Sequence, residues 1–115
     1  MSKNILQEKS LELASLCIEI SKNLQNKKEY AFADQIKRSA TSVGANIAEA
    51  GHPQSRNDMI SKFEIALKEA FETDHWLKVF KQANLIDEKT FDSANKVCTK
   101  IRVLLISSIK TLKSK

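Results

Sequence analysis

Apolar residues recur along this chain at alternating steps of three and four, a spacing that predicts helices with one buried face each. The clearest example runs from residue 33 to residue 50, where the buried-face positions are Ala33, Ile36, Ala40, Val43, Ile47 and Ala50. The neighbouring positions are small and include Ser39, Ser42, Gly44 and Ala48. Because short side chains let two helix axes come close together, we expect this segment to pack tightly against other helices.

The same spacing predicts four helices separated by short polar breaks. We expect them over about residues 4–26, 30–50, 55–83 and 87–112. Ser55 and Asp87 suit the caps of the last two helices, and Gly51-His52-Pro53 suits the end of the second. No segment alternates with a period of two for long enough to form a strand. Short connections favour antiparallel neighbours, so the sequence predicts an all-α fold, an antiparallel up-down-up-down four-helix bundle.

Length and composition fit one domain, residues 1–115, with an aliphatic core. Aromatic residues make up only 6% of the chain. No apolar run approaches the ~20 residues of a membrane span, and the N-terminus lacks the apolar stretch of a signal peptide. We therefore expect a cytoplasmic protein without a membrane segment. Cys17 and Cys98 form no metal-binding or redox pair in sequence, which predicts two reduced core thiols.

The third and fourth predicted helices carry more apolar residues than one buried face needs. The surplus comprises Ile60, Ile65, Leu67, Phe71, Trp76, Val97, Val103, Leu104, Ile106 and Ile109. Exposed apolar stripes usually mark a partner surface. Self-association is the simplest explanation, and a heterologous interface can close a ring. The sequence therefore predicts a homo-oligomer but does not give the number of subunits.

Positive charge is concentrated at the end of this basic chain, whose net charge is +5. After Asp92, the last acidic residue, there are six cationic residues: Lys96, Lys100, Arg102, Lys110, Lys113 and Lys115. The dipole of the last helix accounts for cations in its final turn only. Lys96, Lys100 and Arg102 are therefore candidate nucleic-acid contacts, although solvated lysines are the simpler alternative.

Lys37 and Arg38 form a second basic pair, within the slim second helix. Three environments suit Arg38: solvent, a phosphate group, or a facing carboxylate across a subunit interface. We keep Lys37 and Arg38 as candidate nucleic-acid contacts beside the group on the last helix.

Catalytic motifs are absent from the sequence, which has no glycine-rich phosphate loop and no nucleophile elbow. One metal pattern is present in part, because Glu49-x-x-His52 and Glu72-x-x-His75 have the spacing used by di-iron four-helix bundles. The first helix offers Glu12 or Glu19, but the last offers only Glu88 in its first turn. We expect no enzyme activity, no cofactor and no metal, with a ferritin-like di-metal carboxylate protein as the alternative.

The segment from residue 35 to residue 49 also resembles a known family. It contains Arg38-Ser39-Ala40, Ser42-Val43 and Asn46-Ile47-Ala48-Glu49, and Phe63, Ala66, Glu72 and Leu77 follow downstream. These residues resemble the bacterial four-helix-bundle proteins found in intervening sequences of 23S rRNA genes. The chain departs from that pattern at Gly44, where the family usually has Pro, and at Ala50-Gly51, where one Gly usually follows the Glu.

The resemblance implies a structural role for five motif residues: Ser42, Gly44, Asn46, Glu49 and Glu72. For Asn46 we expect a hydrogen bond with Ser42 or Glu49, each within reach along one helix. A related branch comprises the accessory variability proteins of diversity-generating retroelements. The resemblance further implies a basic homo-oligomer, a pentamer, that handles nucleic acid or a nucleic-acid enzyme such as a reverse transcriptase, with no established catalytic activity.

Together these patterns predict a non-enzymatic oligomeric basic scaffold. It binds structured RNA or DNA, or it docks a protein that handles nucleic acid. The alternatives are the ferritin-like protein and a purely structural interaction module with an acidic protein partner.

Overall fold

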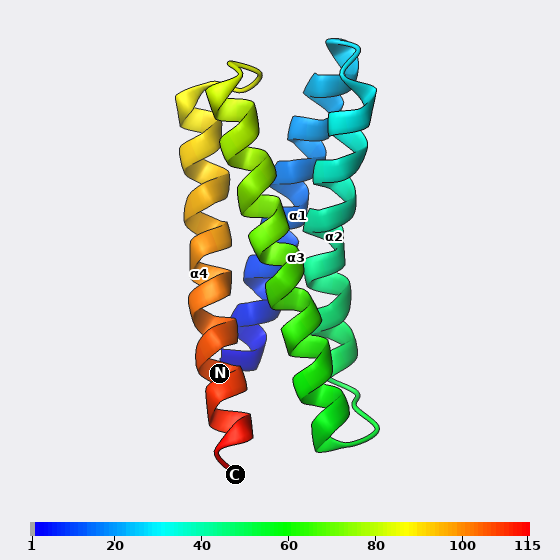
Figure 1. The fold of residues 1–115 in the computed structure, drawn as a ribbon, viewed down its shortest axis with the longest axis vertical. Helices are drawn as coiled ribbons and strands as arrows, with labels where there is room; N and C mark the ends of the chain where they lie inside the picture. The colour runs from blue at the N-terminus through cyan, green and yellow to red at the C-terminus, as the bar shows by residue number, and fades with distance from the viewer. Residues whose placement is uncertain (1) are drawn as a thin grey trace.

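The computed structural model describes the backbone of residues 2–115 and the side chains of residues 5–115. Four helices follow one another along the chain: α1 (Ser2–Asn26), α2 (Tyr30–Ala50), α3 (Arg56–Gln82) and α4 (Glu88–Lys113). They run alternately up and down in a bundle that measures 47 × 21 × 19 Å (Figure 1). The predicted all-α, antiparallel four-helix bundle is confirmed. Within the described residues, no helix is both long and apolar enough to cross a membrane.

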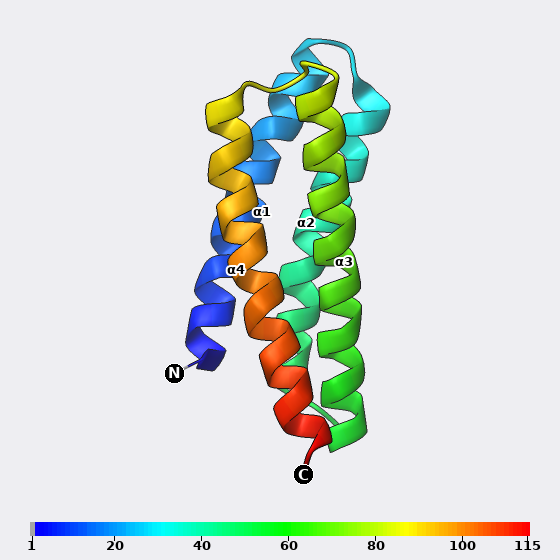
Figure 2. The same ribbon diagram turned by 60° about the vertical axis from the view of Figure 1, so that its left-hand side comes forward.

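Each helix packs against the next one in the chain, and α1 also packs against α4. The contact between α1 and α4 is the least extensive of the four. Figure 2 shows α1 and α4 side by side at this more open edge. In this arrangement α2 and α4 occupy opposite corners of the bundle.

The core is largely aliphatic, and all six predicted buried-face positions of α2 belong to it. Four residues at the edge of the core are half-buried: Leu16, Met59, Ser108 and Leu112. Leu16 lines a groove between α1 and α4, and the other three line a hollow at the end of the bundle where α1 begins.

The small residues of α2 allow a close approach to α1. A Cβ atom at Gly44 would lie 3.3 Å from the hydroxyl oxygen of Ser10, tighter than an ordinary contact. Ser21 Oγ of α1 donates a hydrogen bond to the carbonyl oxygen of Ala33 at 2.9 Å. On the other side of α2, Thr73 Oγ1 of α3 lies 3.0 Å from Ser39 Oγ. Short hydroxyl side chains therefore join α2 to both of its neighbours inside the core.

The starts of α3 and α4 are capped by the predicted residues, whereas the chain turns after α1 and α3 without a glycine. Ser55 Oγ accepts from the backbone N–H of Asp58 at 3.0 Å, and Asp87 Oδ1 accepts from that of Thr90 at 2.7 Å. Gly51 after α2 keeps a right-handed φ of −74°, so it does not use its conformational freedom. Lys28 and Asn84 instead adopt positive φ values of 63° and 60° after α1 and α3.

Candidate nucleic-acid interface

Lys96 and Lys100 lie one turn apart on α4, and both are exposed. Together with Lys9, Val103 and other residues they line the groove between α1 and α4. Among the described side chains, neither Lys96 nor Lys100 has a carboxylate within ion-pair distance. Glu12 also lines this groove, but its carboxylate pairs with Lys9 at 3.3 Å. The structure thus places two adjacent, uncompensated positive charges on α4.

The groove continues toward the start of α4, where Lys89 lines its next section together with Glu19 and Asn23. Sequence reasoning did not identify Lys9 or Lys89 as part of this site. Lys9 belongs to a helix almost ninety residues earlier in the chain, so only the antiparallel contact between α1 and α4 reveals its position. The carboxylates of Glu12 and Glu19 reduce the positive charge on the α1 side of the groove.

Arg38 has a different environment, on α2. Its guanidinium donates hydrogen bonds to Glu69 at 3.2 Å and to Glu72, both on α3. The indole Nε1 of Trp76 also donates to Glu72, at 3.0 Å. Hydrogen bonding to Glu72 raises the pKa of Arg38, and the hydrogen bonds from Trp76 and Arg38 lower the pKa of Glu72.

The carboxylates facing Arg38 therefore belong to its own chain. The sequence had also allowed a facing carboxylate across a subunit interface. The two carboxylates offset the positive charge of Arg38, although its side chain remains 49% exposed. Lys37, next to it, is exposed and has no ion-pair partner among the described side chains. As nucleic-acid contacts, Lys37 and Arg38 stay predictions, and they lie on the opposite corner of the bundle from Lys96 and Lys100.

Arg102 points toward α3 and away from Lys96 and Lys100. Its Nη2 lies 3.8 Å from Asp74 Oδ1 and donates to Thr99 Oγ1 at 3.2 Å. The guanidinium carbon lies 5.1 Å from the centre of the Phe71 ring. Its side chain is only 21% exposed. The charge of Arg102 is thus largely engaged between α3 and α4.

The motif residues within α2 mainly stabilise the bundle. Asn46 Nδ2 donates to the carbonyl oxygen of Ser42 at 2.9 Å and lies 3.3 Å from its hydroxyl, so the expected hydrogen bond is present. Glu49 pairs instead with Lys62 on α3 at 2.9 Å, and this hydrogen bond raises the pKa of Lys62. Glu49 and Glu72 thus both link α2 to α3.

Candidate metal ligands do not gather in the part of the chain that the structure describes. No group of three or more His, Cys, Asp or Glu side chains there is arranged to hold a metal ion. Glu49 and Glu72, which begin the two Glu-x-x-His motifs, are paired with Lys62 and Arg38.

The fold is that of a small antiparallel four-helix bundle, in which ion pairs join α2 to α3. Residues 2–107 match the 23S rRNA-intervening sequence protein family, and the chain belongs to that family. A similar solved structure is a protein of unknown function from the S23 ribosomal protein family of Bacteroides thetaiotaomicron, with 44% sequence identity and a TM-score of 0.91. The match covers 96% of this chain and 99% of that one.

Comparison with curated proteins gave no match. The relation to accessory variability proteins of diversity-generating retroelements stays a prediction.

Proposed function

We propose that this protein is a non-enzymatic, self-associating scaffold that binds structured RNA or duplex DNA through the outer face of α4. The observation that carries the proposal is the pair Lys96 and Lys100: exposed, adjacent and without a carboxylate partner among the described side chains. Lysine ammonium groups with this freedom can approach phosphates without first breaking an ion pair. Lys89 extends the same side of the groove by about two turns.

The expected affinity of one subunit is low. On duplex DNA, each neutralised phosphate contributes about −0.9 to the slope of log K against log salt, so two lysines give a slope of roughly −2. Several copies in one oligomer would add their contacts by multivalency. The resemblance to the family suggests five subunits, and the exposed apolar side chains of α3 and α4 support self-association.

The test is a mobility-shift assay with an RNA hairpin and a DNA duplex at increasing salt. The wild type should bind both at low salt and lose them steeply as salt rises. Lys96→Glu/Lys100→Glu should weaken binding to both ligands alike. The matched control is Arg56→Glu/Lys68→Glu, which changes the net charge equally at exposed positions on α3.

Equal losses in the two double variants would show that net charge, and not α4, determines binding. No shift of either ligand by the wild type at low salt would show that direct binding is wrong. The second candidate function, an adaptor whose basic face meets an acidic protein that handles nucleic acid, would then replace it.

A further inference from the structure

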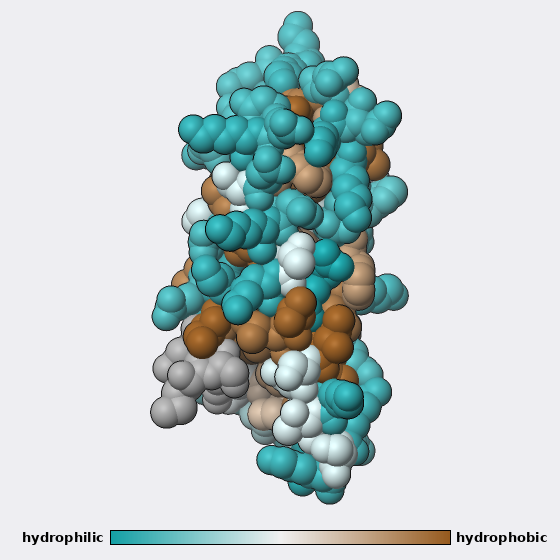
Figure 3. Space-filling model, turned by 90° about the vertical axis from the view of Figure 1, so that its left-hand side faces the viewer, coloured by the Kyte–Doolittle hydropathy of each residue, from teal (hydrophilic) through white to brown (hydrophobic). Residues whose placement is uncertain are grey.

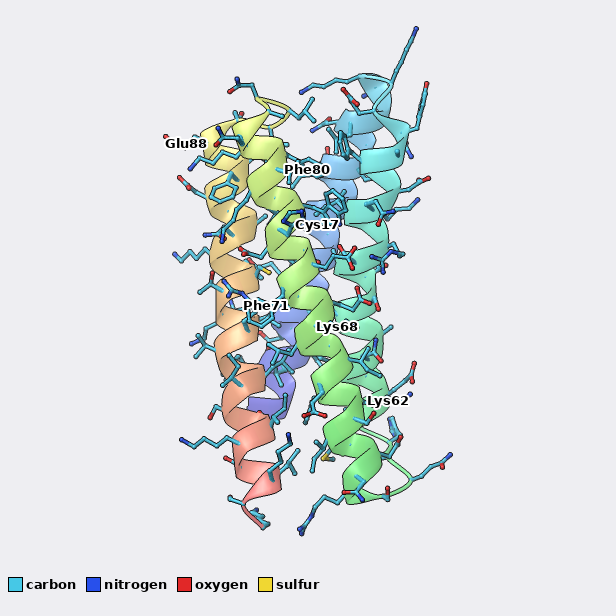
Figure 4. All side chains as sticks on the ribbon, viewed as in Figure 1. Cys17, Lys62, Lys68, Phe71, Phe80 and Glu88 are labelled. Carbon is cyan, nitrogen blue, oxygen red and sulfur yellow. The ribbon has the colours of Figure 1, made fainter. Side chains whose placement is uncertain are left out.

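An open groove runs along the bundle between α1 and α4, the two packed helices with the least extensive contact. It consists of two hollows that share Leu16 and Ser93, so the groove is continuous. On α4 it extends from Lys89 to Val103, a length of about 21 Å at 1.5 Å per residue. In Figure 4, the label of Glu88 marks the end of α4 at which the groove begins. We call this surface the α1–α4 groove.

The floor of the α1–α4 groove is aliphatic. Leu16 is half-buried there, and Ile20 and Val97 are buried beneath the groove with 2% and 6% of their surfaces exposed. Val103, at one end, is 58% exposed. Figure 3, viewed from the side of α4, shows brown surface between the teal side chains of this face. A partner that covers the floor therefore gains free energy by removing apolar surface from water.

The two rims of the groove differ in charge. On the α4 rim, Lys89, Lys96 and Lys100 are exposed, and none has a carboxylate within ion-pair distance among the described side chains. On the α1 rim, Glu19 is exposed and has no lysine or arginine within that distance in the same part of the chain. A positive rim thus faces a rim with a free carboxylate, and the aliphatic floor lies between them.

We propose that the α1–α4 groove binds an amphipathic helix of a partner protein, with the carboxylates of that helix against the lysines of α4. Its apolar face covers the aliphatic floor, and a cationic residue on its other flank meets Glu19. A helix in this position packs against α1 and α4 together, as neighbouring helices of a bundle do. About fourteen residues fill the length of the groove at 1.5 Å per residue. This inference goes beyond the proposed function, because the partner is a protein.

The floor of the groove favours a helix over a nucleic acid. Proteins that bind single strands stack the bases on aromatic side chains, and the described residues that line the groove include no aromatic residue. A duplex meets lysines through its phosphates and leaves an aliphatic floor uncovered. An amphipathic helix uses both the floor and the charged rims.

The test measures binding of a fluorescent helical peptide of about sixteen residues by anisotropy, without nucleic acid. The peptide has leucines on one face, glutamates on one flank and lysines on the other. It should bind the wild type, whereas a peptide with lysines on both flanks should bind at least about tenfold more weakly. Lys96→Glu/Lys100→Glu should weaken binding of the first peptide by a similar factor. The matched control Arg56→Glu/Lys68→Glu should bind it as the wild type does.

A second variant tests the groove without changing the charge. Ser93 is exposed where the two hollows meet, so Ser93→Tyr places a bulky ring in the position of the docked helix. This variant should keep the wild-type circular dichroism and lose the peptide. Ser61→Tyr, at an exposed position of α3, is the matched control and should bind the peptide as the wild type does.

The proposal is wrong if the wild type does not bind the acidic peptide or if Ser93→Tyr still binds it. Loss of the RNA hairpin by Ser93→Tyr, with peptide binding unchanged, would assign the groove to nucleic acid. A lower oligomer mass of Ser93→Tyr in light scattering would assign the groove to a second copy of the chain, and either result would also overturn the proposal. Because the peptide assay contains no nucleic acid, its result is independent of whether the α4 lysines bind RNA or DNA.

Discussion

Arg38 on α2 and Glu72 on α3 form a hydrogen-bonded ion pair, and the same carboxylate accepts a hydrogen bond from Trp76 Nε1. Trp76 in turn packs against Phe32 of α2, with 6.0 Å between ring centroids. The pair therefore joins two helices and also orients the single tryptophan of the chain. Arg38 and Glu72 are both residues by which the sequence resembles its family.

This ion pair predicts a specific loss of stability in acid. The pKa of Glu72 is lower in the folded protein than its ordinary value, so the stabilisation is complete above the unfolded-state pKa of about 4.3 and is lost as pH falls through the folded value. Glu72→Gln should reduce the change in melting temperature between pH 6 and pH 3. Glu8→Gln changes an exposed residue of α1 that has no ion-pair partner among the described side chains. As a control it should keep the wild-type change in melting temperature between pH 6 and pH 3.

Gly44 and Ser10 predict a coupled effect on packing. Gly44→Leu should destabilise the bundle by roughly 1–3 kcal/mol because it overpacks the α1–α2 contact. Gly44→Ala gains up to about 1 kcal/mol of helix propensity, but its Cβ would lie 3.3 Å from Ser10 Oγ. In a Ser10→Ala background the same Gly44→Ala change should therefore be more favourable, as measured by urea unfolding. Additive effects of the two changes would contradict a direct contact.

Lys28 predicts a stabilising substitution. Its positive φ belongs to a helix end in which the N–H of Glu29 donates to the carbonyl oxygen of Leu24 at 2.8 Å. A left-handed conformation costs a non-glycine residue about 1–2 kcal/mol, whereas glycine loses about 0.5–1 kcal/mol of unfolded-state freedom. Lys28→Gly should raise the free energy of unfolding by up to about 1 kcal/mol. Asn84→Gly at the equivalent end of α3 should gain less, because asparagine tolerates this conformation better.

The two cysteines predict slow thiol chemistry. Burial in the core raises the pKa of Cys17 to about 12 and that of Cys98 to about 11. Near pH 8 both thiols are therefore protonated and shielded in the folded protein, and a chromogenic disulfide reagent should label them only as fast as the bundle opens. Ser15→Cys, on the exposed side of α1, should react quickly as a control. Rapid labelling of the wild type under native conditions would contradict the buried positions.

The local features of the bundle are determined by the sequence alone. Steps of three and four between apolar residues predict the helices, because the α-helical repeat brings such positions onto one face. Ser55 and Asp87 predict the starts of α3 and α4 because a cap is formed by residues only three positions apart. The hydrogen bond between Asn46 and Ser42 follows for the same reason, since both lie on one helix.

Tertiary structure decided which charged residues are engaged and which are not. Arg38 and Lys96 are equally plausible contacts in sequence, but Arg38 meets a carboxylate 34 residues away, whereas the structure provides none for Lys96 among the described side chains. The exposure of Phe71, Val103 and Ile106 likewise depends on how α3 and α4 are turned within the bundle. Such outcomes depend on distances between helices remote in sequence, and a repeat along one helix contains no information about them.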